Sequence, residues 1–417
     1  MAPIILITFA GRRNRMEILT NYVQAALAAG IIDEWHVWDF TRSEEDRVWV
    51  SENFGPARFM HPDTPYVSAG KVTPMAPFRM DAGIAADLHL ALLPKNDPDN
   101  FYEFVIGGWD NQLSAVRKMP RVELATFARD HVPRMADFST PGILSPSLPN
   151  SVVMSIDRNG HPVLTANGMK IGPIAEVDVS SGADVMVRGG WGADLEILNV
   201  NDKVRRYIGP RNEKYPYHHT YAYYSKYANR FSDAIFLKCD DDIVYMNLDR
   251  LGDFINFRRD NPTPFLVSAN VVNNGVCAHW QQRSGSLPIE VGHFEMPPGG
   301  LNGSLWESGK RANALHDYFL QTPDKRLPLH QPFIEVKERV SINFISWLGQ
   351  DLKHFGFRRL GDEKALAVDM PRLLNRPVAI YSDFIVSHLS FGPQEAELHV
   401  DRLVSAYSDL MREQLAA

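Results

Sequence analysis

The chain has 417 residues, of which 45% are hydrophobic and 22% charged, a composition typical of a globular protein with two or three domains. A formal net charge of −7 argues against a general nucleic-acid binder, whose affinity would come from neutralising phosphates. The cysteines, Cys239 and Cys277, can form at most one disulfide, so we expect a reducing compartment. The apolar run at residues 4–10 is too short for a membrane span, and its basic residues follow it, unlike those of a secretory signal. We therefore expect a cytoplasmic protein and leave peripheral membrane association and homo-oligomerisation open.

The start of the chain predicts a strand, a helix and a second strand. Residues 4–10 form an apolar run, apolar residues then recur at helical spacing from Met16 to a stop at Gly30, and residues 34–40 resemble a second strand. A βαβ opening implies a parallel sheet whose ligand crevice lies at the carboxyl ends of the strands. The polar residues expected near that crevice are Thr8, Arg12, Arg13 and Asp39.

The pattern changes between residues 74 and 198, where short β-type runs alternate with turn signals. We predict an antiparallel β-sandwich inserted into an α/β domain made of residues 1–73 and 199–417. Within it, Asn159 and Gly160 predict the turn of a hairpin. The two Gly-Gly-Trp tripeptides at 107–109 and 189–191 have unrelated flanks, so we expect separate structural features.

The α/β character returns after residue 200. The patterns predict helices at 217–227, 248–261 and 338–348, and strands at 233–239 and 263–270. The segment from Asn273 to His330 is rich in Gly, Pro and Asn and predicts substrate-facing loops.

Three consecutive carboxylates, Asp240, Asp241 and Asp242, directly follow an apolar strand. In a strand, residues i and i+2 point to the same side, so Asp240 and Asp242 should lie together while Asp241 faces away. Mg²⁺ and Mn²⁺ are commonly held by one or two carboxylates plus substrate phosphates. The alternative is a solvated acidic turn, but apolar residues on both sides of the run favour a cation site.

The stretch FLKCDDDIVYMN (236–247) resembles the DXD element of GT-A-fold glycosyltransferases, in which acidic residues bind a metal and the diphosphate of a nucleotide-sugar. SWLGQDL (346–352) is similar to an acceptor-side element that carries a catalytic base, although Gln350 replaces a frequent second acid. IVSHLSFGPQ (385–394) resembles a C-terminal element whose histidine completes the metal shell. The resemblance implies a Rossmann-related mixed sheet flanked by helices, with Mn²⁺ or Mg²⁺ as cofactor.

The resemblance also implies roles for individual residues. The implied metal ligands are Asp240, Asp242 and His388, and the implied donor-binding residues are Thr8, Arg12, Arg13, Asp39, Asp240 and Asp241. Asp351 takes the place of the catalytic base, with Asp362 and Glu363 as rivals. The residues predicted to bind an acceptor are Asn273, Asn274, Trp280 and Trp347.

These roles imply transfer from a nucleotide-sugar, with a UDP-sugar as the expected donor, to a glycan acceptor in surface polysaccharide synthesis. Inversion follows if Asp351 is the base, and retention becomes the better reading if Asp351 is remote. The alternative from another class is a non-catalytic carbohydrate-binding or scaffolding protein.

Four stretches between residues 78 and 198 resemble the domain named after farnesoic acid O-methyltransferase: DLHLALL, YEFVIGGWDNQLSAVRK, TPGILS and VRGGWGADLEI. No Gly-rich loop with a downstream acid for S-adenosylmethionine is visible in the sequence. We therefore interpret the module as a binding or assembly domain and give methyl transfer little weight.

Overall fold

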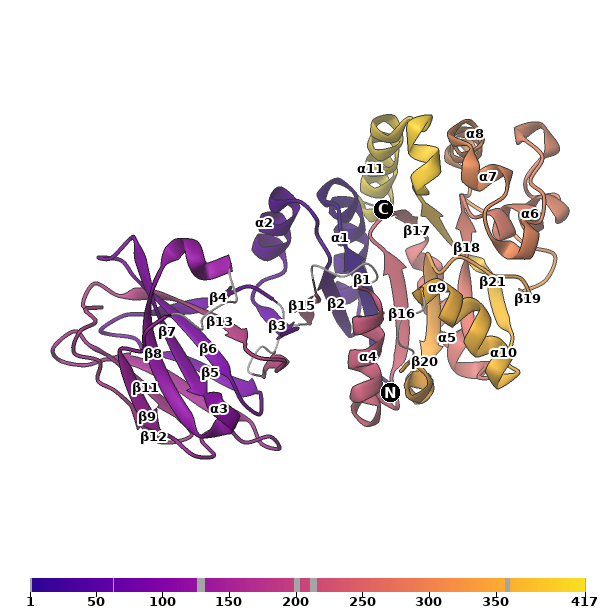
Figure 1. Cartoon of the computed structure of the whole chain (residues 1–417). Coiled ribbons are helices and arrows are strands. Elements are labelled where there is room, and N and C mark those ends of the chain that lie inside the picture. Colours follow the sequence, from indigo (N-terminus) through magenta and orange to yellow (C-terminus); the bar gives the residue numbers. More distant parts are fainter. Residues whose placement is uncertain are drawn as a thin grey trace. The chain divides into compact units, whose positions relative to one another are not determined.

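The computed structural model describes residues 2–62, 64–125, 132–198, 203–210, 216–356 and 361–416. The chain forms two compact units (Figure 1). The α/β unit comprises Met1–Glu52 and Tyr215–Ala417, and the β unit comprises Asn53–Lys214. The β unit is thus wider than the insertion over 74–198 that the sequence predicts.

The α/β unit is built on a mixed sheet. Its strand order is β2 (Glu34–Asp39), β1 (Ile4–Ala10), β16 (Ile235–Asp240), β20 (Phe344–Leu348), β18 (Leu266–Val272), β21 (Val378–His388) and β17 (Ile243–Met246), and β19 (Phe333–Val336) pairs with β21. Strand β1 pairs in parallel with both β2 and β16, which confirms the predicted βαβ opening. Strand β20 runs antiparallel to β16 and β18.

This topology gathers several chain segments at one edge of the sheet, which we call the carboxyl edge. Strands β1, β2 and β16 end there because they are parallel. Strand β20 starts at that edge because it runs antiparallel to β16. Strand β18 runs antiparallel to β20 and β21 runs parallel to β18, so both of them end there. Loops at the carboxyl ends of strands in such a sheet are where ligands bind.

Helices flank the sheet of the α/β unit (Figure 1). The longer helices are α1 (Arg13–Ala28), α2 (Glu44–Asn53), α4 (His218–Lys226), α5 (Leu248–Asp260), α6 (Gly275–Arg283), α8 (Gly309–Gln321) and α11 (Val400–Ala416). The short ones are α7 (Ser304–Glu307), α9 (Asp362–Lys364) and α10 (Met370–Leu374). Helix α1 buries Met16, Leu19 and Val23, which recur at helical spacing, and it packs against α11. Among the helices of the described residues, none is long and apolar enough to cross a membrane.

Two element predictions are wrong. Residues 338–348 contain strand β20 rather than a helix, because a central strand buried on both faces has a continuous apolar sequence that periodicity cannot distinguish from a helix. The predicted loop segment 273–330 contains helices α6, α7 and α8.

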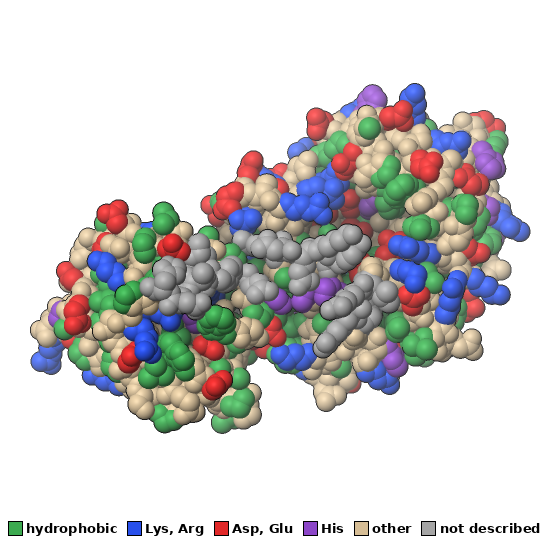
Figure 2. Space-filling view, in the orientation of Figure 1, with side chains coloured by type: hydrophobic (Ala, Val, Ile, Leu, Met, Phe, Trp, Pro, Cys, Tyr) green, Lys and Arg blue, Asp and Glu red, His purple; other side chains and the backbone are tan. Residues whose placement is uncertain are grey.

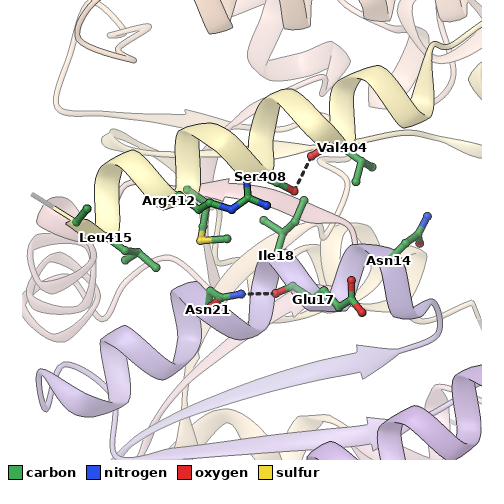
Figure 3. A pocket seen from close by; sticks show the side chains of 10 residues that line it. Asn14, Glu17, Ile18, Asn21, Val404, Ser408, Arg412 and Leu415 are labelled. Atoms are coloured by element: carbon green, nitrogen blue, oxygen red, sulfur yellow. Dashed lines mark hydrogen bonds between the residues drawn. The ribbon is translucent and has the colours of Figure 1, made fainter.

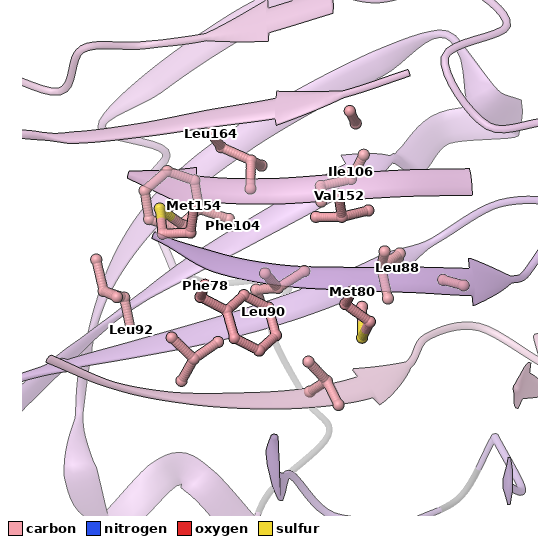
Figure 4. Close-up of a cluster of buried hydrophobic side chains, with 14 of the residues drawn as sticks. Phe78, Met80, Leu88, Leu90, Leu92, Phe104, Ile106, Val152, Met154 and Leu164 are labelled. Atoms are coloured by element: carbon pink, nitrogen blue, oxygen red, sulfur yellow. The ribbon is translucent and has the colours of Figure 1, made fainter. Parts of the chain in front are cut away.

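The β unit is a sandwich of two sheets. One sheet has the order β12 (Met169–Ile171), β11 (Pro162–Ala166), β10 (Asn150–Ile156), β5 (Phe78–Gly83), β14 (Leu195–Ile197), β3 (Ala57–Met60) and β15 (Val204–Ile208). The other has the order β4 (Val67–Val72), β13 (Ala183–Gly189), β6 (Leu88–Pro94), β7 (Asn100–Gly107), β8 (Leu113–Pro120) and β9 (Ala136–Ser139), with the turn α3 (Gly108–Asn111) after β7. Side chains from both sheets, such as Met80, Met154, Leu90 and Phe104, form one core (Figure 4).

The predicted hairpin of the β unit is present, with β10 and β11 antiparallel and Gly160 at a φ of 84° in the connecting turn. On the face drawn in Figure 2, acidic and basic side chains are interspersed on each unit, in keeping with a formal net charge of only −7.

Candidate functional site

The carboxylate run lies at the carboxyl edge, as its position after β16 predicts. Asp240 ends β16 and His388 ends β21. His388 is brought to Asp242 because β17 pairs with β21, with Ile243 opposite His388, and the amide of Leu389 donates to the Asp242 carbonyl at 2.9 Å. One ligand atom from each of Asp240, Asp242 and His388 lies within 4.8 Å of the others. The structure thus groups the three predicted metal ligands.

These three side chains suit a divalent cation. Asp242 is 4% exposed, and within the described residues its Oδ1 accepts no hydrogen bond, although the Nε2 of His388 lies 3.2 Å away. Burial would raise the pKa of Asp242, but His388, Arg12 and Arg15 outweigh it, so the pKa lies below its usual range. Arg12 and Arg15 compensate its charge at Oδ2, and the unsatisfied Oδ1 is the atom left for a cation. Two carboxylates and an imidazole are ligands that Mn²⁺ accepts.

Asp241 faces away from this group, as predicted, and holds the loop after β1. Its Oδ2 accepts hydrogen bonds from the amides of Gly11 (3.0 Å) and Arg12 (2.9 Å), and its Oδ1 accepts one from the Arg12 guanidinium at 3.0 Å. A Cβ on Gly11 would lie 2.9 Å from Asp241 Oδ2, so only glycine allows this approach. Asp241 therefore positions the β1–α1 loop rather than facing a ligand.

Two arginines at the start of α1 lie against the carboxylates. Arg12 donates to Asp242 Oδ2 at 3.0 Å and Arg15 at 3.2 Å, and Arg15 also pairs with Glu395 at 2.6 Å. Arg15 was not predicted, although it lies one helical turn from Arg12, which was the available signal. Both guanidiniums already pair with carboxylates, so an anion such as a diphosphate at the amino end of α1 would exchange with these pairings.

Arg13 was predicted to join this site, and that prediction is wrong. Its guanidinium pairs with Glu17 at 2.8 Å and its amide donates to Asp46 at 2.8 Å. Arg13 is the first residue of α1, and these polar contacts are to residues of α1 and α2 rather than to the carboxylate run.

A hydrogen-bonded chain fixes Asp240 from behind. The Nδ2 of Asn343 donates to Asp240 Oδ2 at 3.2 Å, and the Nδ2 of Asn274 donates to Asn343 Oδ1 at 3.1 Å. The buried ammonium of Lys238 donates to Asp240 Oδ1 and to the carbonyl of Ile342. Sequence reasoning missed Asn343 and Lys238, and it assigned Asn274 to the acceptor.

Asn274 has a structural role instead. It is 1% exposed, and its Oδ1 accepts from the amides of Val276 and Cys277, which makes it the N-cap of α6. Asn273 is also wrong as an acceptor contact, because its amide is fully used by Gln394 and the carbonyl of Leu389 in the interior.

Asp362 and Glu363, the rival bases, lie on α9 close enough to Asp240 to feel its charge. Burial raises the pKa of Asp362, with Lys238 opposing and Asp240 adding to the rise. Burial also raises the pKa of Glu363, which pairs with Arg339 at 2.7 Å. Carboxylates with raised pKa values beside an ionic cluster are suited to proton transfer.

Asp351 does not lie near the cluster. It follows β20, whose last residue Leu348 lies opposite Ile235 at the start of β16, whereas Asp240 is at the end of β16. Five residues of strand separate the two positions by roughly 16 Å. Both oxygens of Asp351 accept hydrogen bonds from Arg376, at 2.6 and 3.0 Å. The assignment of Asp351 as the base is therefore wrong.

Two predicted contacts belong to the core instead. Thr8 is fully buried and its hydroxyl accepts a hydrogen bond from Trp35 at 2.9 Å, so it cannot reach a nucleoside. Trp347 is also fully buried and stacks on Phe236, with 5.4 Å between ring centroids. A residue near the end of a β-strand can point into the core as easily as toward the crevice.

Asp39 and Trp280 have different surroundings. Asp39 ends β2 at the carboxyl edge; its Oδ1 accepts from Thr41, and its buried Oδ2 accepts no hydrogen bond within the described residues. Asp39 therefore remains a candidate for a nucleoside contact. Trp280 lies on α6, with the Cζ of Arg283 at 5.2 Å from its ring centroid. In the described structure it makes no hydrogen bond to the carboxylates.

A groove of about 550 Å³ lies between α1 and α11 (Figure 3). Its lining includes Asn14, Glu17, Ile18 and Ser408 and none of the cluster residues. Within it the Nδ2 of Asn21 donates to the backbone carbonyl of Glu17 at 2.7 Å, and the Glu17 carboxylate pairs with Arg13. The groove therefore offers no group for the chemistry of the cluster.

Comparison with known proteins gives one family match. Residues 61–198 match the family described as farnesoic acid O-methyl transferase, which confirms the resemblance seen in the β unit. The match includes no residue of the α/β unit, and no glycosyltransferase family matches the chain. No curated protein matches the chain.

Two solved structures are distantly similar. The carbohydrate recognition domain of Emp47p has 10% sequence identity and a TM-score of 0.21, over 32% of this chain and 73% of that one. An alginate lyase from Pseudomonas aeruginosa has 12% identity and a TM-score of 0.15, over 31% of this chain and 62% of that one. Both likenesses are too distant to bear on function.

Proposed function

We propose that the α/β unit is a metal-dependent glycosyltransferase of the GT-A type, which moves a sugar from a nucleotide diphosphate donor to a glycan hydroxyl. The observation that carries the proposal is the grouping of Asp240, Asp242 and His388 at the carboxyl edge of a mixed sheet that opens with βαβ. The grouping comes from two strands whose ends are 148 positions apart in sequence, Asp240 and His388, so a chance acidic turn does not explain it. A UDP-sugar as donor and surface polysaccharide as product remain part of the proposal.

The residues of the chain divide the work of donor binding. When bound, Mn²⁺ or Mg²⁺ would neutralise charge on the leaving diphosphate. Arg12 and Arg15 neutralise Asp242 in the present structure, and they are placed to meet diphosphate oxygens at the amino end of α1. Asp39, with its unsatisfied buried oxygen at the end of β2, is the candidate to orient the nucleoside.

The acceptor hydroxyl must lose a proton as it attacks the anomeric carbon. Since Asp351 is remote, we assign this role to Asp362 or Glu363. A raised pKa makes either carboxylate a stronger base, and both lie near enough to Asp240 to interact with its charge. If one of them is the base, the reaction inverts the configuration at the anomeric carbon. If neither is, we expect that configuration to be retained.

Ligand-dependent thermal unfolding tests the donor site. A UDP-sugar with Mn²⁺ should raise the unfolding temperature of the wild-type chain, because a ligand that binds only the native state stabilises it. Asp242→Asn should remove the Mn²⁺-dependent part of this rise and abolish transfer. Asp409→Asn is a matched control, since Asp409 is an exposed partner of Arg412 on α11 and should leave both unchanged. The absence of a rise with any nucleotide-sugar tested, with or without Mn²⁺, would contradict the proposal.

The base assignment has a separate readout. Replacing the true base, by Asp362→Asn or Glu363→Gln, should lower kcat by about 10²–10⁴-fold while leaving Mn²⁺-dependent donor binding intact. Equal turnover in both variants and in the wild type would exclude both residues. A non-catalytic carbohydrate-binding protein would show no donor turnover in any form.

A further inference from the structure

The two Gly-Gly-Trp tripeptides of the β unit lie at the same end of one sheet. Strands β13, β6 and β7 are adjacent, with Gly189 opposite Leu88 and Leu88 opposite Ile106. The amide of Asp87 donates to the Gly107 carbonyl at 3.0 Å, and the amide of Gly190 donates to the Asp87 carbonyl at 2.8 Å. Asp87 therefore sits between the two tripeptides, which we call the tryptophan turns. The sequence predicts that they are not an internal repeat, and the structure places them side by side at the ends of two different strands, β7 and β13.

Both tryptophans have a backbone conformation that bulky residues rarely adopt. Trp109 has a φ of 50° and Trp191 a φ of 40°, and this left-handed conformation strains the backbone of a non-glycine residue. The strain does not bury the rings, since Trp109 is 45% and Trp191 75% exposed. Folding alone gives no reason to strain the chain and leave two indoles in water, whereas a ligand that stacks on them would.

A buried polar network supports both tryptophan turns. Glu103 is fully buried, and its carboxylate accepts from His89 Nδ1 at 3.1 Å and from Arg117 at 3.0 Å. The Arg117 guanidinium lies 5.8 Å from the Trp109 ring centroid. One interior carboxylate therefore anchors the groups beneath both turns.

His89 supplies an independent sign of a built site. It is 2% exposed, and within the described residues its Nε2 has no hydrogen-bond partner. The Nε2 faces Gly190 of the second tryptophan turn, since a Cβ added to Gly190 would lie only 2.5 Å from it. Burial lowers the pKa of His89, and its Nδ1 faces Glu103, so Nε2 is the ring nitrogen left without a partner there. An unpaired buried polar atom costs stability and is retained where a site needs it.

The charges around the turns indicate the class of ligand. Each arginine near Trp109 already has a counter-ion: Arg117 pairs with Glu103, and Arg134 pairs with Asp137 at 3.4 Å. The Asp87 side chain, in contrast, has no hydrogen-bond or ion-pair partner in the described structure. Burial raises its pKa, with the nearby His89 opposing the rise and Asp110 adding to it. The free groups are thus carboxylates, which repel anions and accept hydrogen bonds from hydroxyls.

We infer that the tryptophan turns form a binding site for a neutral glycan, in which Trp191 stacks on the apolar face of a pyranose and Asp87 accepts hydrogen bonds from its hydroxyl groups. A flat aromatic ring beside a hydrogen-bond acceptor matches the two kinds of surface that a sugar ring offers. The inference concerns the β unit alone and holds whether or not the α/β unit transfers sugars.

Binding of neutral oligosaccharides to the full-length chain tests the inference. The probes are hexasaccharides of β-1,4-glucan, β-1,3-glucan, β-1,4-mannan, β-1,4-xylan and β-1,4-galactan, with oligogalacturonate as an anionic comparison. Calorimetry should detect binding of at least one neutral probe, with a change in tryptophan fluorescence and weaker binding of the anionic one. Trp191→Ala should weaken binding at least tenfold, and Trp191→Phe should recover part of it. Asp87→Asn should also weaken it.

The controls separate this site from the rest of the molecule. Met75 is 93% exposed and follows β4, at the end of the sheet opposite Gly189, so Met75→Ala should bind like the wild type. Asp242→Asn should bind glycan normally even where donor binding is lost. No binding of any neutral probe at millimolar concentration, a preference for the anionic probe, or full binding by a folded Trp191→Ala protein would each overturn the inference.

Discussion

Asp351 shows how a buried carboxylate can be structural while lying in a stretch that resembles a catalytic element. Its two oxygens face the Arg376 guanidinium, which also donates to the carbonyls of Pro262 and Pro264. The pair therefore ties the turn after β20 to the residues before β18 and β21. Asp351 is 3% exposed, so its charge depends on Arg376 for compensation.

Asp351→Ala should accordingly affect stability and leave donor binding unchanged. Removing the carboxylate leaves the partly exposed Arg376 without its counter-ion, and we expect the free energy of unfolding to fall by about 2 kcal/mol in urea titrations. Asp409→Ala, which breaks the exposed pair with Arg412, should cost under about 0.5 kcal/mol. If Asp351→Ala kept its stability and instead lost turnover, Asp351 would act as the base despite its position.

At the scale of secondary-structure elements, hydrogen bonds that start at the first turn of α6 link three strands at the carboxyl edge. Asn274 follows β18 and caps α6 through its Oδ1, and its Nδ2 donates to Asn343, which precedes β20. Asn343 in turn donates to Asp240 at the end of β16. Three strands thus share one chain of hydrogen bonds that ends on a proposed metal ligand. Such partners behind a ligand commonly change metal affinity by 10–100-fold when removed.

Asn274→Ala should therefore have two separable effects. Loss of the N-cap should lower stability by about 1 kcal/mol, and loss of the amide should weaken Mn²⁺ binding by about 10-fold or more. Ser308→Ala is the matched control, because Ser308 caps α8 in the same way without contacting the cluster. It should cost similar stability in urea and leave Mn²⁺ affinity, measured by calorimetry, unchanged. Equal Mn²⁺ affinity in both variants would show that Asn274 only caps the helix.

The same elements show what sequence alone can and cannot predict. The prediction that Asp240 and Asp242 lie together is confirmed, although Asp240 ends β16 and Asp242 lies in the turn before β17 rather than in a continuing strand. Asn274 and Asn343 are 69 positions apart and meet only because β18 and β20 are neighbours, which no local pattern specifies. Strand β20 itself was predicted as a helix. The sequence therefore could not show that Asp351 lies at the end of the sheet opposite to Asp240.

At the scale of the whole molecule, both units contain buried histidines, and two of them have a lowered pKa. The change from helical to alternating patterns predicted two units, but their boundaries depend on which strands pair, and β3 and β15 pair within the β unit. His89 lies in the β unit and His316 in the α/β unit. Burial lowers the pKa of both, that of His316 to about 4.

His316 is held neutral by a fixed set of partners. Its Nε2 donates to the carbonyl of Leu389 at 3.0 Å, and its Nδ1 accepts from the Tyr407 hydroxyl at 2.8 Å. That hydroxyl accepts in turn from Ser387 at 2.8 Å. Protonation would put a second N–H where Nδ1 now accepts, in a site with no exposed surface. The folded protein therefore resists the proton that the unfolded chain takes up readily.

The protein should consequently lose stability as the pH falls from about 6.5 to about 4. In this window the unfolded chain, with a histidine pKa near 6.5, binds more protons than the folded chain, so folding weakens with each proton, by roughly 1.4 kcal/mol per pH unit for His316. Urea titrations at a series of pH values measure the slope, which should be smaller in His316→Gln because that side chain does not titrate. His399→Gln, at an exposed position on the same unit, should keep the wild-type slope. An unchanged slope in His316→Gln would mean that His316 is already protonated in the folded protein, and the hydrogen bond from Tyr407 to Nδ1 would then have to be reversed.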